Sequence, residues 1–149
     1  MIKASQSPLL VVEDNDEDFV VFMDFLQDMN VQQPVYRCVD GDDALDFLLG
    51  EGSYQDQNPK IKPSVVLLDL NLPGTDGREV LEQIKEDERF KKIPVVIFTT
   101  SSNPQDIDFC YQNGANGYLV KPIDFEQMRC RIQAFVDFWL NENTLPQLI

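Results

Sequence analysis

Short apolar runs alternate with amphipathic segments five times along the chain. The runs have the length of β-strands and are Leu9–Val12, Val35–Val39, Val65–Leu68, Val95–Phe98 and Tyr118–Val120. Three of them are unbroken rather than alternating, as expected for strands that are covered on both faces of a parallel sheet. Five strand–helix units in this order predict a doubly wound α/β domain with a five-stranded parallel sheet and five helices.

The segments between these runs carry apolar residues at helical spacing. The last segment shows a clear stripe, formed by Phe125, Met128, Ile132, Phe135 and Trp139. Asn103 followed by Pro104 is typical of a helix start, and Gly114 marks the end of the same helix. Because no linker or repeat divides the pattern, we expect one domain over residues 1–141 and an apolar extension over 142–149.

The acidic composition limits the chemistry that the chain can perform. Its 149 residues include 12 Lys and Arg against 26 Asp and Glu, giving a net charge of −14, and there is no histidine. The phosphate backbone of a nucleic acid would be repelled, so we expect no nucleic-acid partner. Catalytic units that need histidine and zinc sites that need imidazole are excluded. Any reaction must therefore use carboxylates, hydroxyls and lysines.

Cysteine usage and the lack of long apolar stretches indicate a cytoplasmic protein. Cys38, Cys110 and Cys130 show no Cys-x-x-Cys spacing, which favours buried, reduced thiols. The first apolar run is too short for the core of a signal peptide. No stretch approaches the roughly 20 apolar residues that span a bilayer, so we expect no membrane partner.

The residues at the ends of the predicted strands are the most informative part of the sequence. The side chains at these ends are Glu13 and Asp14, Asp69, Thr99, and Lys121. In a doubly wound sheet the carboxyl ends of the strands lie near the topological switch point, where ligands bind. Stabilisation by a helix N-terminus explains the acids at 16–18, but it does not explain Asp69 or Lys121. We therefore expect the five side chains to face one cleft.

Three converging carboxylates repel one another, and something must offset that repulsion. At an effective dielectric constant near 20, two carboxylates about 5 Å apart repel by about 3 kcal/mol. Lys121 neutralises one charge, and a divalent cation would neutralise the remainder. Because oxygen ligands suit Mg²⁺, the pattern predicts a magnesium site at Glu13, Asp14 and Asp69.

Asp69 is the candidate nucleophile of this cleft. A carboxylate can attack a phosphoryl group and form an aspartyl-phosphate. Lys121 and Thr99 would hold the phosphoryl oxygens as charge develops. The glycine-rich turn over residues 70–77 keeps bulky groups away and can present the backbone carbonyl of Asn71 to the metal.

With these residues the sequence resembles a response-regulator receiver domain of the CheY-like family. The matching segments are Val11–Asp14, Leu67–Pro73, Asp76–Gly77, Pro94–Thr99 and Gly117–Pro122. They lie within residues 8–140 in the order and near the spacing of the family. The resemblance implies a flavodoxin-like fold with strand order 2-1-3-4-5 and a role in two-component signal transduction.

The resemblance also implies roles for individual residues. Asp69 would be the phosphoacceptor that takes its phosphoryl group from a histidine kinase, and Lys121 would bridge to that group. Mg²⁺ would be held by Asp14, by Asp69, by the backbone carbonyl of Asn71 and by Glu13, the last often through water.

Two further residues are implied as a switch. Thr99 would move toward the phosphoryl group, and Tyr118 would turn inward to fill the space that Thr99 leaves. This shift would pass the signal to the face formed by the fourth helix, the fifth strand and the fifth helix. We expect no output domain, so output would come from a partner or from dimer rearrangement.

Within the family, the sequence is most similar to the phytochrome-associated response regulators of cyanobacteria. The similarity rests on residues 50–54, 76–81, 94–101 and 138–146. It implies a light-regulated, phytochrome-type histidine kinase as donor and a homodimer through the helix-four to helix-five side and the C-terminal extension. Phe138, outside the apolar stripe, and the apolar tail Leu145–Ile149 agree with an interface. The alternative is a tail that folds back onto its own core.

Two other functions fit parts of the pattern. A Mg²⁺-dependent phosphohydrolase of the haloacid-dehalogenase type also forms an aspartyl-phosphate, but it carries a second aspartate where this chain has Asn71, which cannot transfer a proton. A flavodoxin-like carrier would need a phosphate-binding loop after the first strand, where this chain has the acids of residues 13–18. We therefore favour a phosphorylation-controlled signalling domain that is not an enzyme.

Overall fold

The sheet has five parallel strands, as the sequence pattern predicts, in the order β2-β1-β3-β4-β5 that the family resemblance implies. The computed structural model describes residues 7–56 and 61–147. The strands are β1 (Leu9–Val12), β2 (Val35–Cys38), β3 (Val65–Leu68), β4 (Val95–Thr99) and β5 (Gly117–Val120). Most of the N-terminal segment, residues 57–60 of the long connector and the last two residues of the apolar tail lie outside the described residues.

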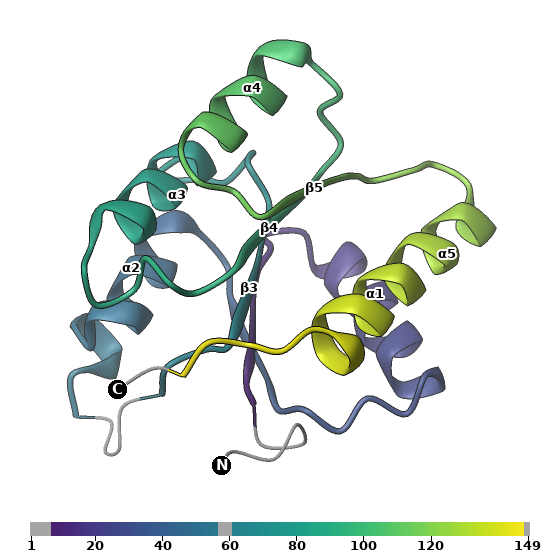
Figure 1. Cartoon of the computed structure of the whole chain (residues 1–149), viewed down its shortest axis with the longest axis horizontal. Coiled ribbons are helices and arrows are strands. Elements are labelled where there is room, and N and C mark those ends of the chain that lie inside the picture. The colour runs from purple at the N-terminus through teal and green to yellow at the C-terminus, as the bar shows by residue number, and fades with distance from the viewer. Residues whose placement is uncertain (1–6, 57–60, 148–149) are drawn as a thin grey trace.

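Helices cover both faces of this sheet (Figure 1). The helices are α1 (Asp16–Asp28), α2 (Gly41–Leu49), α3 (Gly77–Glu86), α4 (Pro104–Gln112) and α5 (Phe125–Phe135), with a short 3₁₀ turn η2 (Gly52–Tyr54) after α2. Helices α1 and α5 pack on one face, and α2, α3 and α4 cover the other, so two apolar cores flank the sheet. This is the doubly wound arrangement that the alternating pattern predicts.

The strand register brings the candidate site residues to one edge of the sheet. Strand β1 pairs in parallel with both β2 and β3, with Val12 opposite Leu68. The strand pairing continues one residue further, because the backbone N–H of Asp69 donates to the carbonyl of Val12 at 3.1 Å. Glu13 and Asp69 therefore leave adjacent strands at the same level. Strands β1, β3 and β4 are buried along their whole length, which explains why their sequences are unbroken apolar runs.

The helix starts follow from side-chain caps. Each of the five α-helices begins after an Asn or Asp whose carboxylate or amide oxygen accepts a backbone N–H of the first turn, and these residues are Asn15, Asp40, Asp76, Asn103 and Asp124. The predicted start at Asn103 is confirmed, and α4 ends at Gln112, two residues before Gly114, which has a positive φ of 92°.

Gly77 sets the distance between α3 and the end of β3. A Cβ at this position would lie 2.2 Å from the backbone oxygen of Asp69 and 2.6 Å from the Cα of Leu70. Because those atoms belong to the backbone, they cannot move aside as a flexible side chain would. The first turn of α3 therefore packs directly against the chain that leaves β3, and its N-terminal residues lie beside the candidate site.

The C-terminal region differs from the prediction in two respects. The fifth helix does not run as one α-helix to Trp139 but changes at Phe135 into a π-helical segment, η3 (Val136–Glu142). Phe125, placed by its spacing in the buried stripe, is 60% exposed, because it stands in the first turn of α5 and contacts only the ring of Phe25 among the aromatic residues described. Phe138 is exposed, as its position outside the stripe predicts.

Part of the C-terminal extension lies against the domain itself. Leu145 packs on the core between α1, α5 and the sheet. The side-chain amide of Gln33 donates to the carbonyl of Leu140 at 3.0 Å and ties the end of η3 to the segment before β2. These contacts are what the folded-back alternative requires.

The cysteines follow the prediction in two cases of three. Cys38 and Cys110 are buried and free, but Cys130 is exposed on α5, so the expectation of a buried thiol is wrong there. The thiols do not pair, as predicted. Among the helices of residues 7–56 and 61–147, none has the length and apolar character that crossing a membrane requires.

Candidate functional site

The ammonium of Lys121 is the centre of the site. It comes directly after β5 and is 5% exposed at its side chain. It donates to Oδ2 of Asp69 at 2.9 Å, to Oδ2 of Asp18 at 3.1 Å and to Oε1 of Glu13. The three carboxylates come from β1, α1 and β3, so one buried cation joins segments that are far apart in sequence.

Three carboxylates form a set of oxygen ligands beside this ammonium. One oxygen from each of Glu13, Asp14 and Asp69 lies within 4.8 Å of the others. Glu13 and Asp69 are buried, whereas Asp14 is exposed. Such an all-oxygen set, open to solvent on one side, fits a hard divalent cation that keeps some of its water. The structure thus brings together the acids that the sequence analysis selected.

The charges within the site do not balance. The single ammonium of Lys121 pairs with three carboxylates, and Asp14 adds a fourth beside Glu13 and Asp69. Burial raises the pKa of Glu13 from 4.5 to about 7, although the hydrogen bond from Lys121 opposes the shift. Burial alone would lower the pKa of Lys121, but Glu13 and Asp69 outweigh it and raise that pKa above its ordinary value. Lys121 therefore stays charged, and the remaining negative charge of the carboxylates favours the binding of a further cation.

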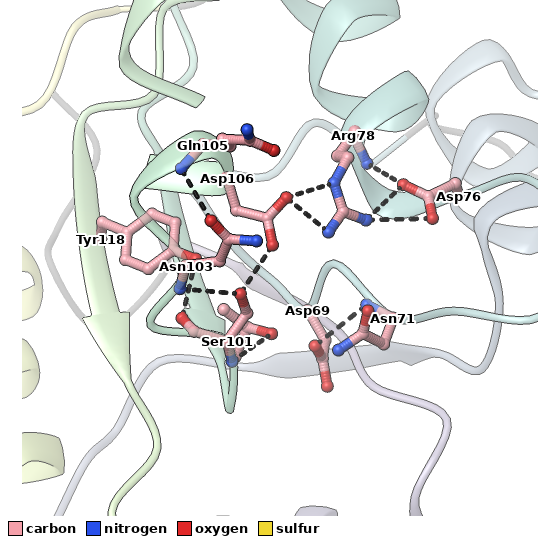
Figure 2. A network of polar contacts seen from close by, with 10 residues as sticks. Asp69, Asn71, Asp76, Arg78, Ser101, Asn103, Gln105, Asp106 and Tyr118 are labelled. Carbon is pink, nitrogen blue, oxygen red and sulfur yellow. Dashed lines mark hydrogen bonds and ion pairs between the residues drawn. The ribbon is translucent and has the colours of Figure 1, made fainter. Parts of the chain in front are cut away.

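One carboxylate oxygen of Asp69 is only weakly hydrogen-bonded. Its Oδ2 is bound by Lys121, while its Oδ1 accepts only a long backbone N–H bond of 3.3 Å from Asn71 among the contacts described. Asn71 itself is exposed, and Figure 2 shows it beside Asp69 on the same turn. The role of the Asn71 backbone carbonyl as a metal ligand stays a prediction.

Thr99 and Tyr118 lie on the side of β4 and β5. Thr99 ends β4, is fully buried, and its carbonyl accepts the backbone N–H of Lys121 at 2.6 Å. Tyr118 is half-buried on β5, and its hydroxyl donates to the carbonyl of Ser101 at 2.9 Å (Figure 2). The two residues named as a switch are therefore connected through the segment that follows β4.

Two contributors to the site, Asp18 and Arg37, were not predicted from the sequence. Asp18 was explained as a favourable charge at a helix start, yet it also binds Lys121. Arg37 donates from Nε to the carbonyl of Glu13 at 3.1 Å, pairs with Asp16 at 2.7 Å and covers the ring of Phe19. A signal for Asp18 was available, because α1 starts only four residues after β1 and its first turn must lie over the strand ends.

The shift at Glu13 predicts a pH dependence of stability without metal. A raised pKa means that the folded chain favours protonated Glu13, so this stabilisation is complete below about pH 4.5 and is lost as the pH rises through about 7. The free energy of unfolding falls by at most about 3 kcal/mol over this pH range. In EDTA, Glu13→Gln should gain stability relative to wild type between pH 5.5 and 7.5, measured by urea unfolding. Glu86→Gln, an exposed change at the end of α3, should show no such gain. Parallel pH profiles for Glu13→Gln and wild type would contradict the assignment.

Comparisons with known proteins agree with the site. Residues 9–133 match the family model described as the response regulator receiver domain. The probable methanogenesis regulatory protein FilR2 of Methanothrix harundinacea is 39% identical over 93% of this chain and 86% of its own length.

Two relatives come from cyanobacteria. Response regulator Rcp1 of Synechocystis is 37% identical over 93% of this chain and 92% of its own length, and its Mn²⁺-bound structure superposes with a TM-score of 0.88, covering 95% of this chain and 99% of that one. The phosphorylated cyanobacterial phytochrome response regulator RcpA is 37% identical, with a TM-score of 0.88 and the same coverage. This chain therefore belongs to the response regulator receiver domain family.

Proposed function

We propose that Asp69 accepts a phosphoryl group from a histidine kinase and that the chain works as a phosphorylation-controlled signalling protein. The observation that carries the proposal is the pairing of a buried Asp69 carboxylate with the Lys121 ammonium, next to the oxygen ligands of Glu13 and Asp14. Support comes from the match of residues 9–133 to the response regulator receiver domain and from the similarity to response regulator Rcp1 over nearly the whole chain.

The transfer follows from the groups present. A carboxylate oxygen of Asp69 attacks the phosphorus of the donor phosphohistidine, an O–P bond forms and the P–N bond breaks, and the leaving imidazole takes up a proton. Lys121 already binds the other Asp69 oxygen and is placed to neutralise charge on the phosphoryl oxygens. Thr99, at the end of the neighbouring strand, is proposed to hold another of these oxygens.

The divalent cation of the site is proposed to be Mg²⁺. Receiver domains bind a divalent metal at this acidic cluster, and the Rcp1 structure is described as a Mn²⁺-bound form. Here Asp14, Asp69, Glu13 and the carbonyl of Asn71 would hold it. When bound, the metal screens the carboxylates from the incoming phosphoryl group.

We favour signalling over phosphohydrolase activity. An aspartyl-phosphate phosphohydrolase needs a proton donor near the leaving group, and the position two residues after Asp69 is Asn71, whose backbone N–H faces the Asp69 carboxylate. An amide side chain does not transfer a proton at neutral pH. The chemistry expected of this chain is therefore its own phosphorylation and autodephosphorylation.

A phytochrome-type, light-regulated histidine kinase is the proposed donor, and the cytoplasm is the proposed location. Support for the donor comes from the likeness to Rcp1 and to RcpA, which is described as a phytochrome response regulator. Free, buried Cys38 and Cys110 agree with a reducing compartment. The net charge of −14 argues against nucleic acid as a partner.

A homodimer is the proposed assembly, through the side formed by α4, β5 and α5 together with the C-terminal extension. Tyr111 on α4 and Phe138 on η3 are 53% and 51% exposed, and such large apolar side chains are common in homodimer interfaces. Leu145 packs on its own core, whereas Pro146 and Gln147 are exposed and are proposed to contribute to the interface.

Acetyl phosphate tests the phosphoacceptor directly. With Mg²⁺ in excess, the wild-type protein should gain one phosphoryl group, seen as a single mass increase by intact-protein mass spectrometry. Asp69→Asn should gain none, because its amide oxygen is not nucleophilic. Asp108→Asn, an exposed change on α4, should behave as wild type. Phosphorylation of Asp69→Asn to the wild-type level would place the acceptor elsewhere.

Magnesium should stabilise the fold, because it relieves repulsion among the clustered carboxylates. Millimolar Mg²⁺ should raise the melting temperature of wild type by a few degrees, corresponding to roughly 1 kcal/mol or more. Asp14→Asn should lose most of this rise, whereas Asp24→Asn, another change on the α1 side, should keep it. An equal rise in both variants would show that the ion acts only by general screening.

Gel filtration tests the dimer. Phe138→Ser should shift wild-type dimers toward monomers, because it removes an exposed apolar side chain from the proposed interface. Val20→Ser, at a residue 56% exposed on α1, removes an exposed apolar side chain from an element outside the proposed interface and should leave the elution volume unchanged. A wild-type protein that elutes as a monomer, with and without phosphorylation, would refute the proposed assembly.

A further inference from the structure

A second polar network lies beside the phosphoacceptor, on the side of α3 and α4 (Figure 2). Its central residue is Asp106 in the first turn of α4. One oxygen of Asp106 accepts from Nε and Nη2 of Arg78 at 2.9 and 2.7 Å, and the other accepts from the hydroxyl of Ser101 at 2.6 Å. Asp106 is thus bound on both oxygens by donors from two different segments.

The network is anchored next to Asp69. Arg78 also donates to both oxygens of Asp76, which caps α3 and accepts the backbone N–H of Arg78 at 2.8 Å. Asp76 precedes Gly77, whose backbone lies against that of Asp69. A displacement of the chain after β3 would therefore also move Asp76 and Arg78.

The other end of the network is Tyr118. The phenol of Tyr118 donates to the carbonyl of Ser101 at 2.9 Å, while the hydroxyl of the same Ser101 is bound by Asp106. Ser101 follows the fully buried Thr99 by two residues, and its backbone N–H lies 3.5 Å from the Thr99 hydroxyl. Figure 2 shows Ser101 between Asp106 and Tyr118. One residue thus connects Thr99, Tyr118 and α4.

Burial and charge indicate that these bonds are stronger than ordinary surface contacts. The side chains of Arg78 and Asp106 are 28% and 18% exposed. The bonds from Ser101 and Arg78 lower the pKa of Asp106, so it stays ionised at neutral pH. The more exposed pair of Arg89 and Asp87, with side chains 60% and 25% exposed, is similar in chemistry, but its hydrogen bonds lie within one loop.

We propose that Arg78, Asp106 and Ser101 are positioning residues that hold the Tyr118 ring inward before a phosphoryl group arrives. The inward position is the observed one, in which Tyr118 packs on the core beneath α2, α3 and α4 and bonds the Ser101 carbonyl. The inference rests on the proposed function, because it assigns these residues a part in controlling the Asp69 site.

Linkage gives the expected consequence. If the phosphorylated chain prefers the inward position of Tyr118, a contact that stabilises this position also favours phosphorylation. The effect can be no larger than the amount by which the contact favours the inward position over the alternative. Loss of the Arg78–Asp106–Ser101 connection would let the segment after Thr99 move, and the Ser101 carbonyl would no longer fix the phenol of Tyr118. Phosphorylation would then have to order this segment first.

The test compares four variants with wild type. Asp106→Asn and Ser101→Ala break the network, Ser101→Thr keeps the hydroxyl, and Asp87→Asn breaks the exposed control pair. Two quantities are measured on each protein. One is the rate constant of phosphorylation by subsaturating acetyl phosphate with Mg²⁺, and the other is the ¹⁹F resonance of Tyr118 in fluorotyrosine-labelled protein, assigned with Tyr118→Phe.

We expect Asp106→Asn and Ser101→Ala to lower the rate about fivefold or more and to shift the Tyr118 resonance before phosphorylation. Ser101→Thr and Asp87→Asn should match wild type in both measurements. Thermal unfolding checks that each variant is folded. If Asp106→Asn does not fold, Ser101→Ala alone tests the inference, because it removes only one hydroxyl.

Failure of this inference is distinguishable from failure of the proposed function. A wild-type protein that takes no phosphoryl group would refute the function, whatever the variants do. A phosphorylated wild type with rates and Tyr118 resonances unchanged in both network variants would refute the inference alone. Lowered rates without any change at Tyr118 would refute it as well, since the network would then act by another route.

Discussion

The site depends on one buried ammonium that is surrounded by more negative charge than it can neutralise. Removing charged groups from water costs several kcal/mol for each, and only close pairing offsets that cost. Lys121 pairs with Asp69, Asp18 and Glu13, which come from three segments of the chain, so it fixes their relative positions. An excess of acid remains, and burial of Glu13, with a smaller contribution from the charge of Asp69, raises the pKa of that carboxyl. The same imbalance that weakens the metal-free fold makes the site receptive to a divalent cation.

Most of the fold could be predicted because its signals are local. Unbroken apolar runs mark β1, β3 and β4, which are covered on both faces, and Asn103 with Pro104 marks the start of α4. The positions of Glu13, Asp69 and Lys121 follow from topology alone, since parallel strands end at the same edge of the sheet. The strand order needed the family resemblance, because apolar periodicity does not say which strands are neighbours.

What the sequence did not reveal are contacts that depend on side-chain direction. Asp18 had a sufficient local explanation as a helix-start charge, which hid its contact with Lys121. Arg78 and Asp106 are 28 residues apart, and no periodic pattern relates them. Phe125 has the right spacing for the core, but a first-turn position at the end of the sheet leaves it exposed, because spacing gives the face of a helix and not how much of that face is covered.

The cluster at Lys121 and the network around Arg78 differ in how they respond to added charge. The cluster at Lys121 carries unbalanced charge, so its energy changes when a cation or a phosphoryl group arrives. The network of Arg78, Asp76 and Asp106 pairs its single cation with two carboxylates inside one set of hydrogen bonds. The described contacts offer two routes from Asp69 to this network, one through the backbone at Gly77 and one through the segment from Thr99 to Ser101. Ser101 lies on the second of these routes. Its backbone N–H contacts the Thr99 hydroxyl, its hydroxyl bonds Asp106 and its carbonyl bonds Tyr118, so this small residue connects the end of β4 to both α4 and β5.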